Sequence, residues 1–187
     1  MSKLRVSLIR RAAALLVLPL LLVLVPLGSA SAADGAEAWK KAQAKVEYTV
    51  YRPTETAGLS RTFFKVYPTC SQGGDPLVQI EYGRQNGKRW IGIDQSQREC
   101  LDAPDEHGPA GTFSVRGAKA TVLGRCIPEA GSCASTTRAG VRQSATTSVT
   151  LPASGGKGTT HVVVSTQGLT LAEIKNVVRS LVPVRSR

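Results

Sequence analysis

The residues best suited to chemistry in this 187-residue chain are four cysteines, Cys70, Cys100, Cys126 and Cys133. Cys126 and Cys133 enclose six residues in the stretch CIPEAGSC. Structural zinc sites use cysteine pairs two to four residues apart, together with closely spaced histidines, and redox centres use the spacing C-x-x-C. Neither pattern occurs here. The cysteines are therefore predicted to form disulfides, with no metal centre and no cofactor.

The residues enclosed by Cys126 and Cys133 are a candidate recognition loop. A short disulfide loop can hold a peptide rigid for a protease cleft, which lowers the entropy lost on binding. Ile127, Pro128 and Glu129 are the candidate contact residues in it. The alternative, which we favour, is an ordinary turn closed by a disulfide.

A third candidate is the stretch DAPDEHGP, in which His107 follows Asp105 and Glu106. A histidine beside carboxylates can transfer a proton, so a small hydrolase is one hypothesis. The prolines and glycine instead indicate an exposed turn, and the alternation around His161 indicates a structural role in a strand. The chain contains no nucleophile-elbow motif and no phosphate-binding glycine loop. We therefore assign no catalytic residue and predict that the protein is not an enzyme.

The N-terminus predicts the compartment. Residues 1–11 are basic and lack acidic residues, residues 12–27 are an apolar run, and the small triplet Ala30-Ser31-Ala32 follows. This order is typical of a secretory signal peptide, here cleaved after Ala32. A retained anchor is the alternative, but the run is shorter than the ~20 residues of a membrane-spanning helix. No cysteine lies at the cleavage point, so we predict a secreted protein and not a lipoprotein.

The mature chain of 155 residues has the length of one domain. It keeps 20 of the 24 Lys and Arg residues against 13 Asp and Glu, a net charge of +7. Basic residues spread in this way suit a solvated surface or an anionic envelope component. No basic-aromatic motif for nucleic acid is present. The predicted organisation is a signal peptide (1–32), a leader (33–45) and one domain (46–187), and we expect a monomer.

Period-two alternation of apolar residues predicts most of the secondary structure. Asn86-Gly87 favours a two-residue type I′ hairpin turn. With that turn, paired residue numbers sum to 173, so Tyr82 faces Ile91 and Ile80 faces Ile93. The apolar residues of both strands then share one face, as a correct register requires. The segments with strand character are 46–51, 62–67, 77–82, 90–94, 112–115, 118–123, 148–151 and 160–165.

The C-terminal segment 170–181 predicts a helix. Thr170 and Glu173 form a capping box, and an apolar stripe at helical spacing predicts packing against the sheet. Residues 33–45 are either a short helix or a loose leader, and most of 134–147 is predicted to be loop. The resulting fold class is α+β: an antiparallel sheet of about seven strands with a C-terminal helix packed on it and two disulfides.

The hairpin register also selects the cysteine pairing. Four cysteines allow three connectivities. Extended outward, the register places Cys100 opposite residue 73, close to Cys70. This predicts the disulfides Cys70–Cys100 and Cys126–Cys133.

The chain resembles a known family in its arrangement. The elements that carry the resemblance are V-Y-R-P-T-x3-G at 50–58, the W-I-G-I-D-Q hairpin, V-R-G at 115–117 and the final G-L-T-L-A-E-I-K-N-V-V-R-S-L-V-P at 168–183. Together they are similar to a domain of unknown function in exported or membrane-tethered bacterial proteins, some associated with anti-sigma factors. The chain departs from that family by its two cysteine pairs and by lacking a tryptophan in the last hairpin. The resemblance implies a non-catalytic envelope module related to lipoprotein-carrier-like sheets.

The sequence therefore predicts a secreted, non-enzymatic binding or sensing module of the bacterial cell envelope. Its candidate partners are an anionic envelope component or an extracellular protein, and nucleic acid is not among them. The alternative is an extracellular protease inhibitor that presents the Cys126–Cys133 loop. A concave apolar pocket between the sheet and the helix would favour binding, a protruding 126–133 loop would favour inhibition, and a serine or carboxylate beside His107 in a cleft would favour a hydrolase.

Overall fold

A computed structural model describes residues 30–70, 74–100, 106–126, 133 and 136–185. Residues 1–29 of the predicted signal peptide lie outside the described residues, so export stays a prediction. Ile127, Pro128, Glu129 and Asp105 also lie outside them.

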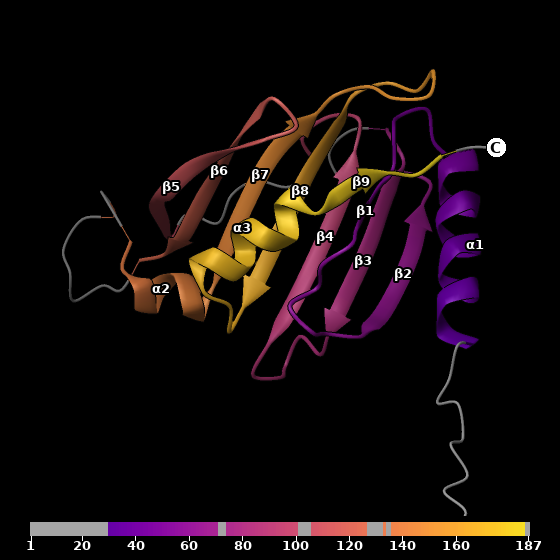
Figure 1. Ribbon diagram of the computed structural model, residues 1–187. Coiled ribbons are helices and arrows are strands. Elements are labelled where there is room, and N and C mark those ends of the chain that lie inside the picture. The colour runs from indigo at the N-terminus through magenta and orange to yellow at the C-terminus, as the bar shows by residue number, and fades with distance from the viewer. Residues whose placement is uncertain (1–29, 71–73, 101–105, 127–132, 134–135, 186–187) are drawn as a thin grey trace, which may run out of the picture.

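Seven antiparallel strands form the main sheet, which confirms the predicted fold class. Their order across the sheet is β2-β3-β4-β8-β7-β6-β5. Two meanders, β2 to β4 and β5 to β8, are joined where β4 pairs with β8 (Figure 1). The strands are β2 (Arg61–Tyr67), β3 (Leu77–Gly83), β4 (Trp90–Ser96), β5 (His107–Val115), β6 (Ala118–Arg125), β7 (Ala145–Leu151) and β8 (Thr160–Gln167).

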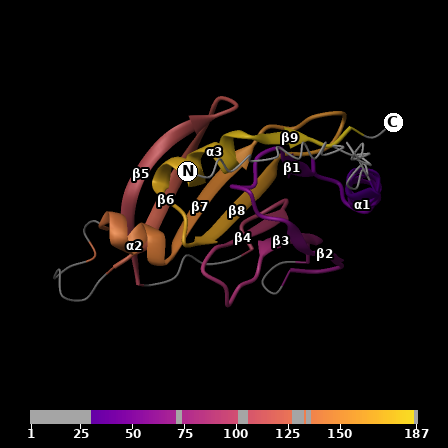
Figure 2. The same ribbon diagram turned by 60° about the horizontal axis from the view of Figure 1, so that its bottom comes forward.

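One face of the sheet is covered by α1 (Ala30–Ala44), α3 (Leu171–Arg179) and a short ribbon. The ribbon is a separate two-stranded pair of β1 (Tyr51–Pro53) and β9 (Leu181–Pro183). Figures 1 and 2 show these elements on the same side of the sheet. The capping box at the start of α3 is present as predicted, and α3 buries its apolar stripe.

The hydrophobic core lies between the sheet and this cover. Ile80, Ile93 and Val164 are completely buried at its centre. In α1, Trp39 is only 6% exposed and its ring meets Phe64 edge to face, with centroids 4.8 Å apart. Of the two alternatives for residues 33–45, the structure has the helix, and that helix is packed into the core. The opposite face of the sheet, called here the outer face, carries none of the three described helices (Figure 2).

The predicted register of the β3–β4 hairpin is confirmed. Tyr82 pairs with Ile91 and Ile80 pairs with Ile93. The predicted turn type is wrong, because neither Asn86 nor Gly87 has a positive φ and the Gly87 N–H donates to the Arg84 carbonyl at 2.7 Å. The type I′ conformation occurs instead in the β5–β6 hairpin at Arg116-Gly117, with φ values of 49° and 80°.

The end of the β3–β4 hairpin leaves the ladder because it packs against β8. The carbonyl oxygen of Lys88 approaches Gly168 so closely that a Cβ on Gly168 would overlap it. Residues 84–89, next to this contact, lie outside both strands. The local Asn-Gly signal therefore gives way to a tertiary contact.

The strand predicted over 46–51 is wrong for most of its length. It forms one isolated bridge, between Tyr48 and Gly158, and β1 begins only at Tyr51. Two buried glutamines take the place of a neighbouring strand. Gln43 bonds the Tyr48 carbonyl at 2.9 Å and the Val50 N–H at 2.7 Å. Gln95 bonds both the N–H and the carbonyl of Tyr51 at 2.7 Å.

The loop predicted over 134–147 contains a helix, α2 (Arg138–Gln143), and the start of β7. Thr137 caps α2 by accepting a hydrogen bond from the Gly140 N–H at 3.1 Å. Val141 is 4% exposed and anchors this turn of helix in the core. One buried valine in a six-residue helix is too weak a pattern to be found by periodicity.

Both predicted disulfides are confirmed. The Cα atoms of Cys70 and Cys100 are 6.0 Å apart, and those of Cys126 and Cys133 are 5.6 Å apart. Disulfides persist in oxidising compartments, so the pairing indicates an extracellular environment. Among the described helices, none combines the length and hydropathy that crossing a bilayer requires.

Candidate functional site

The structure brings His107 next to a serine. His107 Nε2 lies 3.2 Å from Ser144 Oγ, but its Nδ1 is buried and has no hydrogen-bond partner among the described residues. Burial is the main cause that lowers the pKa of His107, and Arg125 lowers it further. Glu106 lies 3.8 Å from Arg125 instead of orienting the imidazole. The carboxylate that a catalytic triad needs on Nδ1 is therefore missing from the described surroundings.

The other predicted sites show no arrangement of side chains that suits catalysis or metal binding among the described residues. His161 contacts Thr150 and lies 3.9 Å from Glu99, consistent with a place in strand β8. Within the described ranges, no group of three or more His, Cys, Asp or Glu side chains could hold a metal. The inhibitor hypothesis depends on 127–129, outside the described residues, and stays a prediction.

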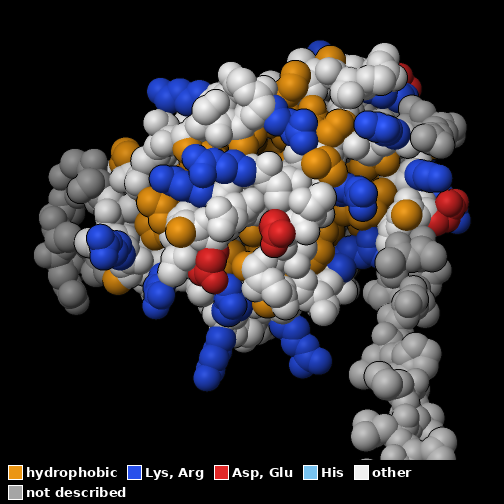
Figure 3. All heavy atoms as spheres, in the orientation of Figure 1, with side chains coloured by type: hydrophobic (Ala, Val, Ile, Leu, Met, Phe, Trp, Pro, Cys, Tyr) orange, Lys and Arg blue, Asp and Glu red, His pale blue; other side chains and the backbone are white. Residues whose placement is uncertain are grey.

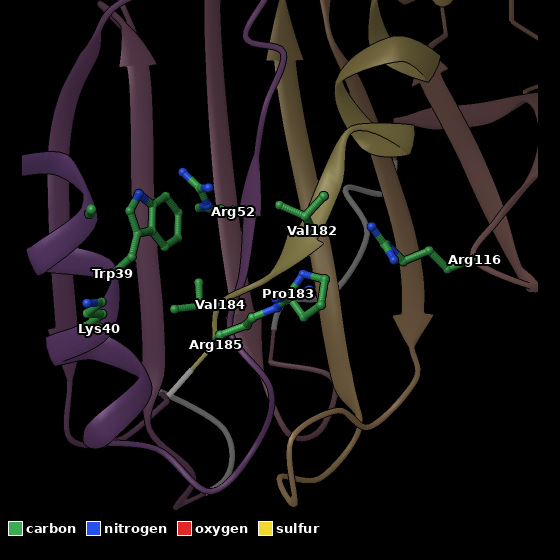
Figure 4. A pocket seen from close by; sticks show the side chains of 9 residues that line it. Trp39, Lys40, Arg52, Arg116, Val182, Pro183, Val184 and Arg185 are labelled. Carbon is green, nitrogen blue, oxygen red and sulfur yellow. The ribbon is translucent and has the colours of Figure 1, made fainter. Parts of the chain in front are cut away.

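A groove on the helix-bearing face is a candidate binding site. It has a volume of about 580 Å³ and lies between α1 and the β1–β9 ribbon (Figure 4). Among the described residues, its lining contains four cationic side chains and no acidic one. We call it the cationic groove, defined by Ala36, Trp39, Lys40, Arg52, Arg116, Val182, Pro183, Val184 and Arg185.

Pairing of β1 with β9 determines which side chains of the ribbon point into the core and which point into the groove. Tyr51 and Leu181 are buried at 1% and 0% exposure. Because neighbouring residues of a strand point to opposite faces, Arg52 and its cross-strand partner Val182 point away from the core. A cationic and an apolar side chain therefore lie side by side. The hydrogen bonds of Gln95 to Tyr51 hold β1 in this register.

Arg116 reaches the groove from the β5–β6 turn. Its positive φ turns the chain back on itself, and its Nε donates to the Leu181 carbonyl at 2.6 Å. Its guanidinium carbon lies 6.0 Å from the centre of the Tyr51 ring. This anchors the guanidinium over the ribbon, opposite α1 (Figure 4).

A second hollow, of about 370 Å³, continues the cationic groove along α1. It shares Ala36, Trp39 and Arg52 with the groove and adds Arg61 and Tyr82. Burial raises the pKa of Tyr82 to about 12, although Arg61 and Arg52 oppose the shift. Arg52, Arg61 and Tyr82 line the same hollow.

The cations of the groove are not neutralised by ion pairs within the described chain. None of the observed salt bridges involves Lys40, Arg52, Arg61, Arg116 or Arg185. Figure 3 shows this face, with Lys and Arg side chains around exposed hydrophobic atoms and few acidic side chains. Like charges gathered without counter-charges favour the binding of an anion.

Comparison of the chain with protein-family models, curated proteins and solved structures gives no match. The family resemblance in the sequence therefore stays a proposal. The function has to be inferred from the geometry of the cationic groove.

Sequence reasoning missed the cationic groove because its residues come from four separate segments. Basic residues spread along the chain were predicted to form a solvated surface or to meet an anionic partner. The fold gathers Lys40, Arg52, Arg116 and Arg185 from α1, β1, a hairpin turn and the C-terminal segment. The one local signal was the exposed arginine of β1, placed between the buried Tyr51 and the partly buried Pro53.

Proposed function

We propose that the protein is a non-enzymatic binding module, exported to the bacterial cell envelope, that holds an anionic and partly apolar envelope component in the cationic groove. The observation that carries this proposal is the lining of the groove. Arg52 and Arg116 suit a charged head group, since guanidinium groups form charge-assisted hydrogen bonds with phosphate or carboxylate. Trp39 and Val182–Val184 offer apolar contact for the rest of the ligand.

Two further observations support binding without catalysis. Apart from the Lys40 amine, the described part of the groove lining contains no side chain that would act as a base or nucleophile. Arginine remains protonated in proteins and so holds anions without exchanging protons. The two disulfides, the predicted signal peptide and the family resemblance support an exported module.

The test measures the affinity of the protein for monomeric dodecyl phosphate. The double variant Arg52→Gln with Arg116→Asn removes two guanidinium groups, and asparagine accepts the positive φ at position 116. Affinity should fall about thirtyfold, since each charge-assisted hydrogen bond contributes roughly 1 kcal/mol or more. The chain has two tryptophans, so Trp39 fluorescence in a Trp90→Phe background reports the groove alone.

The matched control is Arg84→Gln with Lys119→Gln, which removes the same charge from exposed positions outside the groove. It should leave affinity within about twofold, because exposed charges at a distance are screened by salt. Equal loss in both double variants would mean that net charge alone attracts the ligand. That result, or the absence of dodecyl phosphate binding, would contradict the proposed function.

A further inference from the structure

The outer face of the sheet carries an indole seated on a glycine. Trp90 opens β4, and Gly92 follows on the same face. A Cβ at Gly92 would lie 2.5 Å from Cη2 and 2.6 Å from Cζ2 of Trp90, so the ring rests where a side chain would otherwise stand. The Trp90 Nε1–H donates to Glu81 Oε2 at 3.4 Å. Trp90 is only half-buried, so part of the ring is open to solvent.

Hydrogen-bonding side chains surround this indole. The register pairs Glu81 and Ser165 with Gly92 on either side, and it pairs Gln167 with Trp90 itself. All of these side chains lie on the outer face, since the intervening residues of β3, β4 and β8 point into the core. The indole therefore has a carboxylate, an amide and a hydroxyl group at neighbouring positions of the adjacent strands.

Asp94 supplies an acceptor without a partner. It follows Gly92 on the same face, it is 8% exposed, and its Oδ1 has no hydrogen-bond partner among the described residues. Gln79 is its cross-strand neighbour and bonds the carboxyl group. A buried acceptor left unpaired is destabilising, and a donor brought to it relieves that cost.

The charges on this face differ from those in the cationic groove. Glu81 and Asp94 belong to the patch, and Lys65 of β2 is the neighbouring cation, opposite Gln79. Two carboxyl groups repel an anionic ligand. The patch therefore disfavours an anion, and its indole and hydrogen-bond acceptors suit a ligand with an apolar face and a rim of hydroxyl donors.

We infer that the patch formed by Gln79, Glu81, Trp90, Asp94 and Ser165 is a second binding site, and that it takes a neutral glycan. A pyranose ring has an apolar face of C–H bonds that stacks on an indole. Its hydroxyl groups donate to carboxylates and amides and also accept hydrogen bonds. This inference is independent of the proposed function, because it concerns the opposite face of the sheet.

The experiment is a titration of the protein with cellohexaose, maltohexaose and N-acetylchitohexaose, followed by calorimetry and by tryptophan fluorescence. At least one hexasaccharide should bind, and Trp90→Ala should weaken it about tenfold or more, by loss of the aromatic contact. Trp90→Phe should retain part of the affinity. Glu81→Gln keeps the indole and should weaken binding about threefold, which gives a readout if Trp90→Ala fails to fold.

The control is the groove double variant Arg52→Gln with Arg116→Asn, which should bind the hexasaccharide with unchanged affinity. The inference is overturned if none of the three hexasaccharides binds. It is also overturned if Trp90→Ala and Glu81→Gln, both folded by circular dichroism, bind as tightly as the original protein.

Discussion

Replacement of Gln95 with leucine is expected to lower the free energy of unfolding by about 4 kcal/mol. The side chain is fully buried and bonds the N–H and the carbonyl of Tyr51, both at 2.7 Å. Leucine would leave two backbone groups unpaired in the core, and each costs roughly 1–3 kcal/mol. No neighbouring strand can pair with these two backbone groups, because β9 is the only strand that pairs with β1 in the described structure and it lies on the opposite edge of β1.

Urea unfolding monitored by circular dichroism measures this loss. The matched control is Gln143→Leu, at an exposed position of α2, which should change stability by no more than about 0.5 kcal/mol. If the free energy of unfolding falls by less than about 1 kcal/mol in Gln95→Leu, the hydrogen bonds of the glutamine to Tyr51 do not replace those of a neighbouring strand. The variant should also weaken ligand binding, because Gln95 holds the strand that carries Arg52.

Replacement of Asp94 with asparagine is expected to stabilise the protein at neutral pH by up to about 3 kcal/mol. Burial is the main cause that raises the pKa of Asp94 from 3.8 to about 6, and Glu81 raises it further, against the bond from Gln79. Each pKa unit corresponds to about 1.4 kcal/mol. Because the folded-state pKa is raised, the ionised carboxylate destabilises the folded state.

The stabilisation by Asp94→Asn should depend on pH, because the penalty exists only where Asp94 is ionised. Below pH 3.8 Asp94 is protonated in both states and carries no penalty, and the full penalty is present once the pH has risen above 6. The difference between Asp94→Asn and the original protein should therefore be near zero at pH 3.5 and largest at pH 7.5. Urea unfolding at several pH values, with Glu55→Gln as an exposed control, measures it. A constant difference across this range would contradict the raised pKa.

Local patterns predicted the sheet well, for a physical reason. Alternation of buried and exposed residues placed Ile80 opposite Ile93, and the register held even though the turn at Asn86-Gly87 has another conformation. A one-residue slip of either strand would have moved the apolar residues of that strand to the solvent-facing side of the sheet. The same register brought Cys100 near Cys70, so the disulfide pairing followed from it.

Hydrogen bonds from side chains to the backbone limited the prediction elsewhere. Residues 46–50 alternate like a strand, but Gln43 and Gln95 satisfy the backbone from 48 to 51 through their side chains. Nothing in the local sequence distinguishes a glutamine that does this from one on a surface. The cationic groove could not be predicted from the local sequence for a similar reason. The pairing of β1 with β9 that forms it joins residues about 130 positions apart.

The most direct test of the cationic groove is an NMR titration of the isotopically labelled protein with monomeric dodecyl phosphate. The backbone amides of Arg52, Arg116, Val182 and Val184 should shift most, with those of β1 and β9 moving together. The amides of Trp90 and Asp94 on the outer face should stay within the noise. The largest shifts on the outer face, or shifts scattered over exposed lysines and arginines, would contradict a binding site between α1 and the ribbon.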